Sequence, residues 1–356
     1  MTALLEARRV SKVFGGGLLG QGRVTALDEL SFRVDDEAPS ITAIVGESGS
    51  GKTTLARLLL GLAAPTSGEV LYRGNDLRRL SGTERRRFLR EVQVIFQDPF
   101  EVYNPFYRVD HVLDVPIRKF GLAKGDAARR TLIAEALAAV GLRPEETLGR
   151  YPHQLSGGQR QRIMVARALL LRPRLIIADE PVSMVDASLR ATILGSLRTL
   201  NREFGISIVY ITHDLTTAYQ ISRDVIVLYR GAMAEAGGAE AVVGDPQHPY
   251  TRLLVGSIPL PNPDLPWRGE RALGEPVTGL APAGESFCRF YDRCPHAMPV
   301  CVERAPPLFR TAPDRGTACY LYREAPIISA EELARVVGGG GEATGGAEVA
   351  ATLKAG

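Results

Sequence analysis

Apolar positions along the first two thirds of the chain follow two alternating patterns. Short runs of β-branched and aliphatic residues predict buried strands, and apolar residues three or four positions apart predict amphipathic helices. The expected strands are 4–14, 25–34, 41–45, 69–72, 92–96, 175–178, 206–211 and a hairpin-like segment at 225–235. The expected helices are 54–61, 83–90, 107–120, 126–141, 157–171 and 187–204. Because strands and helices alternate, the pattern favours an α/β fold with a parallel sheet.

Two regions depart from this alternation. The stretch of about 98–157 lacks strand patterns, which predicts a helical subdomain inserted into the α/β region. Near 239 prolines become dense, so we place a boundary between a first domain, 1–238, and a second, loop-rich domain, 239–335. The last residues, 336–356, are rich in glycine and alanine, and they are expected to form a flexible tail because they carry too little apolar surface to order themselves.

Composition narrows the class of protein. A chain of 356 residues suggests two domains, and 45% hydrophobic with 23% charged residues is typical of globular proteins. A net charge of +3 is too small to indicate a nucleic-acid partner. The sequence has no apolar run near the ~20 residues that span a bilayer. The N-terminus is not typical of a secretion signal, so any membrane work would need another subunit.

The sequence between the apolar run 41–45 and the next helix predicts a phosphate-binding loop. It reads GESGSGKT over 46–53 and matches the pattern G-x-x-x-x-G-K-[ST]. Glycines let backbone N–H groups converge on phosphates, and the helix N-terminus adds partial positive charge. Lys52 can reach the β- and γ-phosphates, while the Thr53 hydroxyl can bind Mg²⁺. The nucleotide-binding residues expected here are Gly46, Glu47, Ser48, Gly49, Ser50, Gly51, Lys52, Thr53 and Thr54.

Further candidate residues stand at strand ends. Asp179 and Glu180 follow an apolar run, where Asp179 can supply a second Mg²⁺ ligand and Glu180 can polarise an attacking water. His213 follows the next strand and is placed to reach the γ-phosphate, although a lone strand-end histidine is more often structural. Phe14 ends the first strand, where it can either stack on a base or belong to the core.

A second anion-binding helix start lies at 156–158, which reads Ser-Gly-Gly. The phosphate loop already accounts for one nucleotide. This additional site therefore suggests a phosphate that is presented by another chain.

Taken together, these motifs resemble the ATP-binding subunit of an ABC transporter over roughly residues 4–236. The resemblance implies a P-loop NTPase fold, with a RecA-like core, an antiparallel β subdomain and a helical subdomain, and it implies ATP hydrolysis with Mg²⁺. Lys52 and Thr53 match the Walker A motif, and Asp179 and Glu180 match Walker B and the catalytic glutamate. The resemblance makes Gln97, in the Q-loop, a catalytic residue and Mg²⁺ ligand. The remaining matches are Ser156, Gly157, Gly158 and Gln159 for the signature, Asp186 for the D-loop, His213 for the switch histidine and Phe14 for adenine stacking.

Several longer motifs resemble one branch of this family, the oligopeptide and dipeptide importers. They read FQDPFEVYNP at 96–105, RYPHQLSGGQRQRI at 150–163, DPQHPYTRLL at 245–254, CRFYDRCPHAMPVC at 288–301 and ACYL at 318–321. The resemblance implies two ATPase subunits, identical or paralogous, with two membrane permeases and an external binding protein. It places the chain peripherally on the cytoplasmic face of the membrane. Some relatives move sugars or metal chelates instead of peptides.

All four cysteines, Cys288, Cys294, Cys301 and Cys319, lie in the second domain with spacing C-x5-C-x6-C-x17-C. A reducing cytosol disfavours disulfides, and the crowding favours a metal site over inert core thiols. The spacing is not the C-x2-C pairing of most zinc folds. Some members of the resembling branch carry a [4Fe–4S] cluster here, and Cys294-Pro295 is similar to ferredoxin-type ligands. We therefore expect an iron–sulfur centre, with zinc as second choice.

Other functions fit the sequence less well. ABC ATPases of translation usually carry two cassettes, and this chain has one. Those of DNA repair separate the two Walker motifs by a long coiled coil, whereas Lys52 and Asp179 are only 127 positions apart (179 − 52). An intact set of nucleotide-site residues weighs against a metal or redox sensor with a vestigial ATPase. An exporter is disfavoured because no membrane segment is fused to the cassette.

Overall fold

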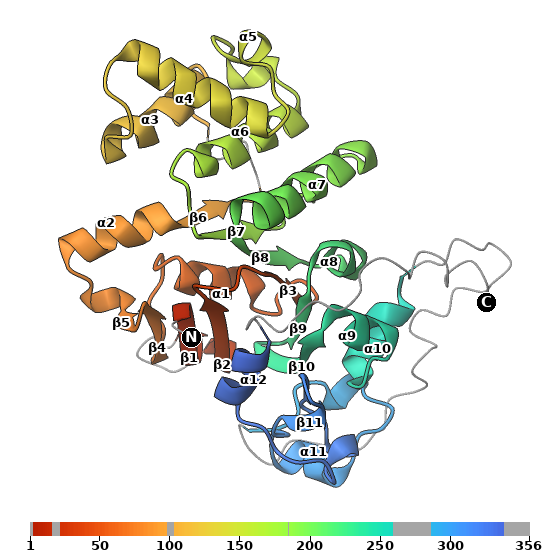
Figure 1. Ribbon diagram of the computed structural model, residues 1–356. Coiled ribbons are helices and arrows are strands. Elements are labelled where there is room, and N and C mark those ends of the chain that lie inside the picture. Colours follow the sequence, from red (N-terminus) through yellow and green to blue (C-terminus); the bar gives the residue numbers. More distant parts are fainter. Residues whose placement is uncertain (1–2, 16–21, 98–102, 184, 259–285, 338–356) are drawn as a thin grey trace, which may run out of the picture.

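The computed structural model describes residues 3–15, 22–97, 103–183, 185–258 and 286–337, and the statements below concern these residues. They form a four-stranded sheet, an eight-stranded sheet and a separate group of helices (Figure 1). None of the described helices has the length and apolar character needed to cross a membrane.

The eight-stranded sheet is the centre of the molecule, with strand order β11-β12-β10-β9-β3-β8-β7-β6. Its strands are β3 Ile41–Val45, β6 Val92–Ile95, β7 Leu175–Asp179, β8 Ser207–Thr212, β9 Asp224–Tyr229, β10 Ala232–Gly238, β11 Phe309–Ala312 and β12 Arg315–Thr317. The strands β6, β7, β8, β3 and β9 pair in parallel, and the strands beyond β9 pair antiparallel. Every residue of β3, β7 and β8 is buried, as expected for parallel strands covered on both faces. The strands predicted at these positions are therefore present.

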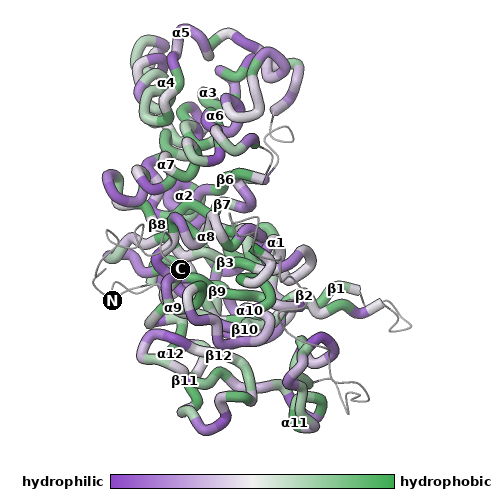
Figure 2. The backbone as a smooth tube through the Cα atoms, turned by 90° about the vertical axis from the view of Figure 1, so that its right-hand side faces the viewer, coloured by the Kyte–Doolittle hydropathy of each residue, from purple (hydrophilic) through white to green (hydrophobic). Residues whose placement is uncertain are grey.

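The four-stranded sheet is antiparallel, with order β2-β1-β4-β5. Its bounds are β1 Ala3–Phe14, β2 Val24–Asp35, β4 Ser67–Tyr72 and β5 Asn75–Asp76. The buried side chains Leu5 and Phe32 share one core with Leu55 and Leu58 of helix α1 (Lys52–Leu59). This core also includes Ile44, so the antiparallel sheet and one face of the central sheet enclose α1. Figure 2 shows β3 and β9 as mostly hydrophobic and β1 as a mixture of hydrophobic and hydrophilic positions.

Helices α3 to α6 form a layer apart from the four-stranded sheet (Figure 1). Their bounds are α3 Asp110–Phe120, α4 Asp126–Ala139, α5 Pro144–Thr147 and α6 Gly157–Leu169. Leu113, Ile133, Leu137 and Ile163 pack together and continue into the core on the second face of the central sheet. That face is also covered by α7 (Ala187–Phe204) and α8 (Leu215–Ile221), while α2 (Gly82–Glu91) leads into β6.

The described residues beyond 238 are joined to the central sheet. β12 pairs with β10, so that Glu235 lies opposite Thr317, and β11 pairs with β12. Helix α12 (Ala330–Val336) packs on β2, and its Leu333 enters the core with Phe32. The other helices of this region are α9 Ala239–Gly244, α10 Pro249–Gly256 and α11 Pro299–Glu303. The sequence pattern predicts neither β11 nor β12, and the tail expected at 336–356 lies outside the described residues from 338 onward.

A buried ion pair joins the region beyond 238 to β10. Glu235 is 0% exposed and Arg315 is 4% exposed, and Nε of Arg315 lies 2.8 Å from Oε1 of Glu235. The Glu235 carboxylate also accepts hydrogen bonds from the backbone N–H groups of Gln247 and His248. One carboxylate thus connects β10, β12 and the turn before α10.

We expect Arg315→Met to destabilise the protein by about 3–5 kcal/mol, because it leaves the Glu235 carboxylate buried without its partner. The measurement is the urea midpoint of unfolding, followed by circular dichroism. Arg323→Met is the matched control, since Arg323 and its partner Glu324 are exposed and their pair contributes little. Equal midpoints for the two variants would contradict the role given to Arg315.

Candidate active site

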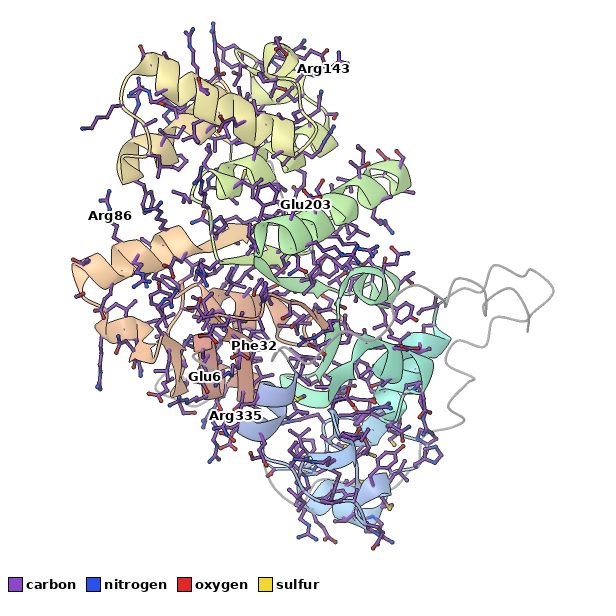
Figure 3. All side chains as sticks on the ribbon, in the orientation of Figure 1. Glu6, Phe32, Arg86, Arg143, Glu203 and Arg335 are labelled. Carbon is purple, nitrogen blue, oxygen red and sulfur yellow. The ribbon has the colours of Figure 1, made fainter. Side chains whose placement is uncertain are left out.

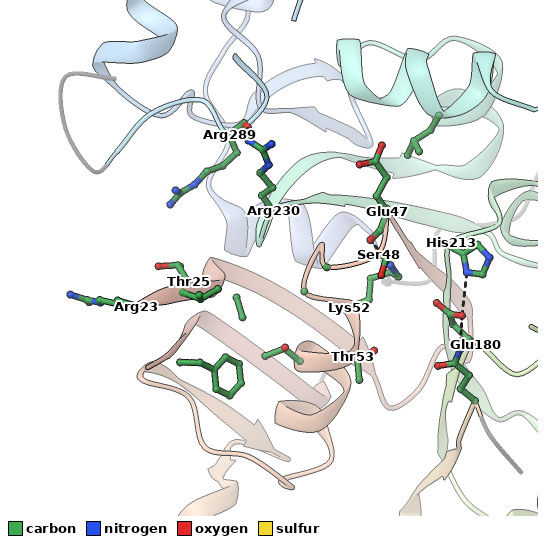
Figure 4. A pocket seen from close by; sticks show the side chains of 18 of the residues that line it. Arg23, Thr25, Glu47, Ser48, Lys52, Thr53, Glu180, His213, Arg230 and Arg289 are labelled. Carbon is green, nitrogen blue, oxygen red and sulfur yellow. Dashed lines mark hydrogen bonds and ion pairs between the residues drawn. The ribbon is translucent and has the colours of Figure 1, made fainter. Parts of the chain in front are cut away.

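A cavity of about 1210 Å³ opens at the carboxyl edge of the parallel strands (Figure 4). Parallel pairing brings the ends of β3, β7 and β8 to the same edge, since Val45 lies opposite Thr212 and Asp179 opposite Ile211. Among the sequence-predicted residues, those that line the cavity are Phe14, Glu47, Ser48, Gly49, Gly51, Lys52, Thr53, Thr54, Gln97, Glu180 and His213.

The loop 46–51 turns the chain from β3 into α1. Gly51 has φ 101°, and a Cβ atom there would lie 2.4 Å from the carbonyl oxygen of Ala26, so only glycine fits. Lys52 is buried, and its Nζ donates to the carbonyl oxygens of Gly46 at 2.7 Å and Glu47 at 2.9 Å. Burial lowers the pKa of Lys52, and the nearby acidic groups, Glu180 foremost, oppose this shift. The loop therefore presents one buried ammonium group and its backbone N–H groups to an anion.

Asp179 and Thr53 are suited to hold Mg²⁺. Asp179 is 8% exposed, and its Oδ1 atom is buried without a hydrogen-bond partner among the described residues. Burial and the neighbouring Glu180 raise the pKa of Asp179, whereas a hydrogen bond with the Thr53 side chain lowers it. A carboxylate oxygen without a partner beside a hydroxyl matches the oxygen ligands that Mg²⁺ prefers.

Glu180 is held by two side chains from different parts of the chain. Gln97 Nε2 donates to Oε2 of Glu180 at 3.1 Å, and Nδ1 of His213 lies 3.2 Å from the same oxygen (Figure 4). The Glu180 backbone has φ 46°, a left-handed conformation that costs a non-glycine residue about 1–3 kcal/mol. The strained turn and the two contacts fix a carboxylate at the cavity, where it can accept a proton from a water molecule.

Phe14 is placed at the open rim of the cavity rather than in the core. Its side chain is 45% exposed, and the Lys12 ammonium lies 5.2 Å from the ring centroid. An exposed ring at this rim is available to stack on a base.

The predicted signature and D-loop residues lie elsewhere in this chain. Ser156 caps α6, because its Oγ accepts from the backbone N–H of Gln159 at 3.2 Å. A Cβ at Gly158 would meet Leu189 of α7 at 2.5 Å, and Asp186 caps α7. Hydrogen bonds from Leu189 and Ser188 lower the pKa of Asp186. The described lining of the cavity includes none of these residues or Gly157.

The cavity also has lining residues that the sequence motifs do not indicate. These are Arg23, Val24, Thr25, Ala26, Arg230, Leu254, Phe287 and Arg289. Phe287 and Arg289 come from the C-terminal region, more than 200 positions from the phosphate loop, so a local pattern carries no signal for them.

The four cysteines lie in one part of the C-terminal region and all are free thiols. The backbone N–H of Cys288 donates to the carbonyl oxygen of Cys301 at 2.8 Å. Burial raises the pKa of Cys288 and of Cys319 to about 12; Cys294 and Cys301 add to both shifts, and Cys288 adds to that of Cys319. The described residues contain no group of three His, Cys, Asp or Glu side chains that could hold a metal ion. The described residues therefore give no support to the expected [4Fe–4S] centre or to its zinc alternative.

Comparison with known proteins shows sequence similarity over most of the chain. Residues 27–183 match a family model described as ABC transporter. Residues 234–301 match a model described as oligopeptide/dipeptide transporter, C-terminal region. The putative oligopeptide transport ATP-binding protein YkfD of Bacillus subtilis is 42% identical over 324 residues, which cover 90% of this chain and 96% of that protein. The oligopeptide transport ATP-binding protein AppF of Bacillus subtilis is 40% identical, covering 90% and 97%.

Among solved structures, the ATP-binding cassette MJ0796 is similar in fold. Its dimeric post-hydrolysis state, bound to ADP and Pi, matches with a TM-score of 0.59 and 29% identity. The match covers 66% of this chain and 98% of that cassette.

We expect Glu180→Gln to retain nucleotide binding and to lower the rate of ATP hydrolysis by roughly 10²–10⁴, the usual loss when a positioned base is removed. Phosphate release at saturating ATP measures the rate, and titration with a fluorescent ATP analogue measures binding. Glu203→Gln is the control, because Glu203 is exposed on α7 (Figure 3) and is not among the described residues that line the cavity. An unchanged rate in Glu180→Gln would assign the base role to another group.

Proposed function

Because this chain belongs to the family of ABC transporter ATP-binding subunits, in its oligopeptide branch, we propose that it supplies the energy for peptide uptake. It is an ATPase that binds ATP with Mg²⁺ and couples hydrolysis to import. One observation carries the proposal: the phosphate loop, Glu180 just after β7 and the strand-end His213 line one cavity, in a chain whose C-terminal region matches that of oligopeptide transporters.

We propose the following roles for the residues at the cavity. Lys52 and the loop N–H groups bind the β- and γ-phosphates, and Thr53 and Asp179 hold Mg²⁺, which neutralises phosphate charge when bound. Glu180 accepts the proton of the attacking water. Gln97 and His213 orient that carboxylate and meet the γ-phosphate; the open position of His213, 58% exposed, supports this.

We propose that each complete site is built by two chains. Ser156 and the start of α6 lie outside the cavity that contains Lys52, so they are free to meet ATP bound by a partner. The related cassette MJ0796 forms a dimer. The partner is a second copy or a paralogous ATPase subunit. The phosphate loop of one chain and the start of α6 of the other would then close on one γ-phosphate.

Membership of the family supports a proposal for the other partners and for the location. We propose two membrane permeases, an external binding protein that selects the substrate, and a peripheral position on the cytoplasmic face of the membrane. Peptides are favoured over oligosaccharides or metal chelates because the similar relatives are named as oligopeptide or peptide proteins. We propose that the segment 98–105 receives a permease helix; residues 98–102 of it lie outside the described residues. We also propose that the boundary between the two domains lies at 238 and that about 98–157 form a helical subdomain.

We expect Ser156→Arg to block ATP-driven dimerisation while the monomer still binds nucleotide, since Ser156 would contact only the partner's ATP. Sizing by light scattering with and without ATP, in the Glu180→Gln background, measures association. In cells that lack the native gene, this variant should not restore peptide uptake, whereas the wild-type chain should. Loss of nucleotide binding by the Ser156→Arg monomer would contradict the two-chain site. Peptide uptake by cells that contain neither the wild-type chain nor the variant would contradict the proposed role in uptake.

We propose the metal centre separately, because the four cysteines are free thiols, and burial first and neighbouring thiols second raise the pKa of Cys288 and of Cys319. Binding would require the thiols to deprotonate and move together, and it would then stabilise the fold directly. Anaerobically purified protein should contain about four irons with a band near 400 nm, or one zinc if the second choice holds. Protein with neither metal and four titratable thiols would rule the centre out.

A further inference from the structure

The segment 287–294 of the C-terminal region reaches back to the phosphate loop. Its Phe290 is 2% exposed, and its ring lies 5.2 Å from that of Tyr229 and 5.6 Å from that of Tyr250. Two ion pairs secure the segment on either side: Arg289 pairs with Asp28 at 2.8 Å, and Arg230 pairs with Asp292 at 2.8 Å. The segment is therefore fixed to the strands that frame the cavity.

This segment and α10 hold Glu47 of the phosphate loop at two points. Arg293 Nη1 lies 2.9 Å from Oε2 and 3.2 Å from Oε1 of Glu47. The Tyr250 hydroxyl oxygen accepts a hydrogen bond from the backbone N–H of Glu47 at 2.8 Å. The carbonyl oxygen of Glu47 accepts from Lys52. Backbone and side chain of one loop residue are thus both set by groups from the C-terminal region.

The charge of Glu47 makes this contact relevant to binding. Glu47 lines the cavity, and Lys52 is the only basic side chain in the loop. In Figure 4 the Glu47 carboxylate points away from Lys52 and Thr53. A free carboxylate at this position would repel a nucleoside triphosphate, and one unit charge near a protein surface changes an affinity by roughly fivefold to tenfold.

We propose that Arg293 is a positioning residue for nucleotide binding, because it keeps the Glu47 carboxylate paired and turned away from the phosphates. The ligand concerned is a nucleoside triphosphate in the site described above, so the inference rests on the proposed ATPase function. It assigns to the C-terminal region a direct part in shaping the phosphate loop. Tyr250 fixes the loop backbone, and Arg293 neutralises its only acidic side chain.

A double-mutant cycle in the full chain tests this role, with a fluorescent ATP analogue and Mg²⁺ as the probe. We expect Arg293→Ala to raise the Kd about fivefold to tenfold in wild-type background and less than about twofold when Glu47→Gln is also present. The penalty should shrink between about 50 mM and about 500 mM salt, since screening weakens charge repulsion but not lost packing. Arg293→Lys should retain most of the affinity, and steady-state kinetics should place the defect in KM more than in kcat.

Arg310→Ala is the matched control, because Arg310 is another arginine of the C-terminal region in a partly exposed ion pair, with Glu332. It does not belong to the described lining of the cavity, so its Kd should equal that of the wild type. Thermal midpoints verify folding, and Arg293→Gln replaces Arg293→Ala if the latter is unfolded.

Three outcomes separate the possibilities. A Kd that is equal in the wild type and in the folded Arg293 variants would overturn the proposal. An increase by the same factor in both Glu47 backgrounds, with no dependence on salt, would also overturn it, because the effect would then come from packing. A wild-type chain that binds no nucleotide would instead refute the proposed ATPase function.

Discussion

Parallel pairing of β3, β8 and β7 is the constraint on which the rest of the site depends. It places the ends of three strands at one edge of the sheet. The phosphate loop, Asp179 and the residue after Thr212 therefore lie at this edge although they are far apart in the sequence. Burial on both faces of the sheet fixes this register, because a slip would move polar strand-end groups into the apolar cores. The position of Glu180 relative to Lys52 is therefore a property of the sheet.

The same sheet explains how much could be predicted from sequence. The run Ile41–Val45 and the phosphate-loop motif are local patterns, and the observed β3 and α1 follow them. The contact between Glu180 and Gln97 joins residues 83 positions apart, and that between Arg293 and Glu47 joins residues 246 apart. Neither leaves a periodic signal, because it depends on the tertiary fold. The strand Arg315–Thr317 has only three residues, too few for a pattern of alternation to be recognised.

The described structure holds part of the catalytic set in place and leaves the rest at a distance. Glu180 already contacts Gln97 and His213, whereas Ser156 and Asp186 serve as helix caps in the region of α6 and α7. Capping leaves the helix N-termini ordered, which suits the contact with a partner's phosphate that we propose for the start of α6. We therefore propose that one chain binds nucleotide alone and that its partner completes the chemistry.

The pairing of β10 with β12 has a consequence for how the protein is made. β10 must wait for a partner strand that is synthesised some 80 residues later, since Glu235 and Arg315 have that separation. Until then β10 has an unpaired edge and a carboxylate without its guanidinium, and the core under β2 lacks Leu333. An exposed edge of this kind invites pairing with other chains. The emerging polypeptide thus passes through a stage that is prone to aggregation. This stage ends when β12 pairs with β10 and Leu333 enters the core.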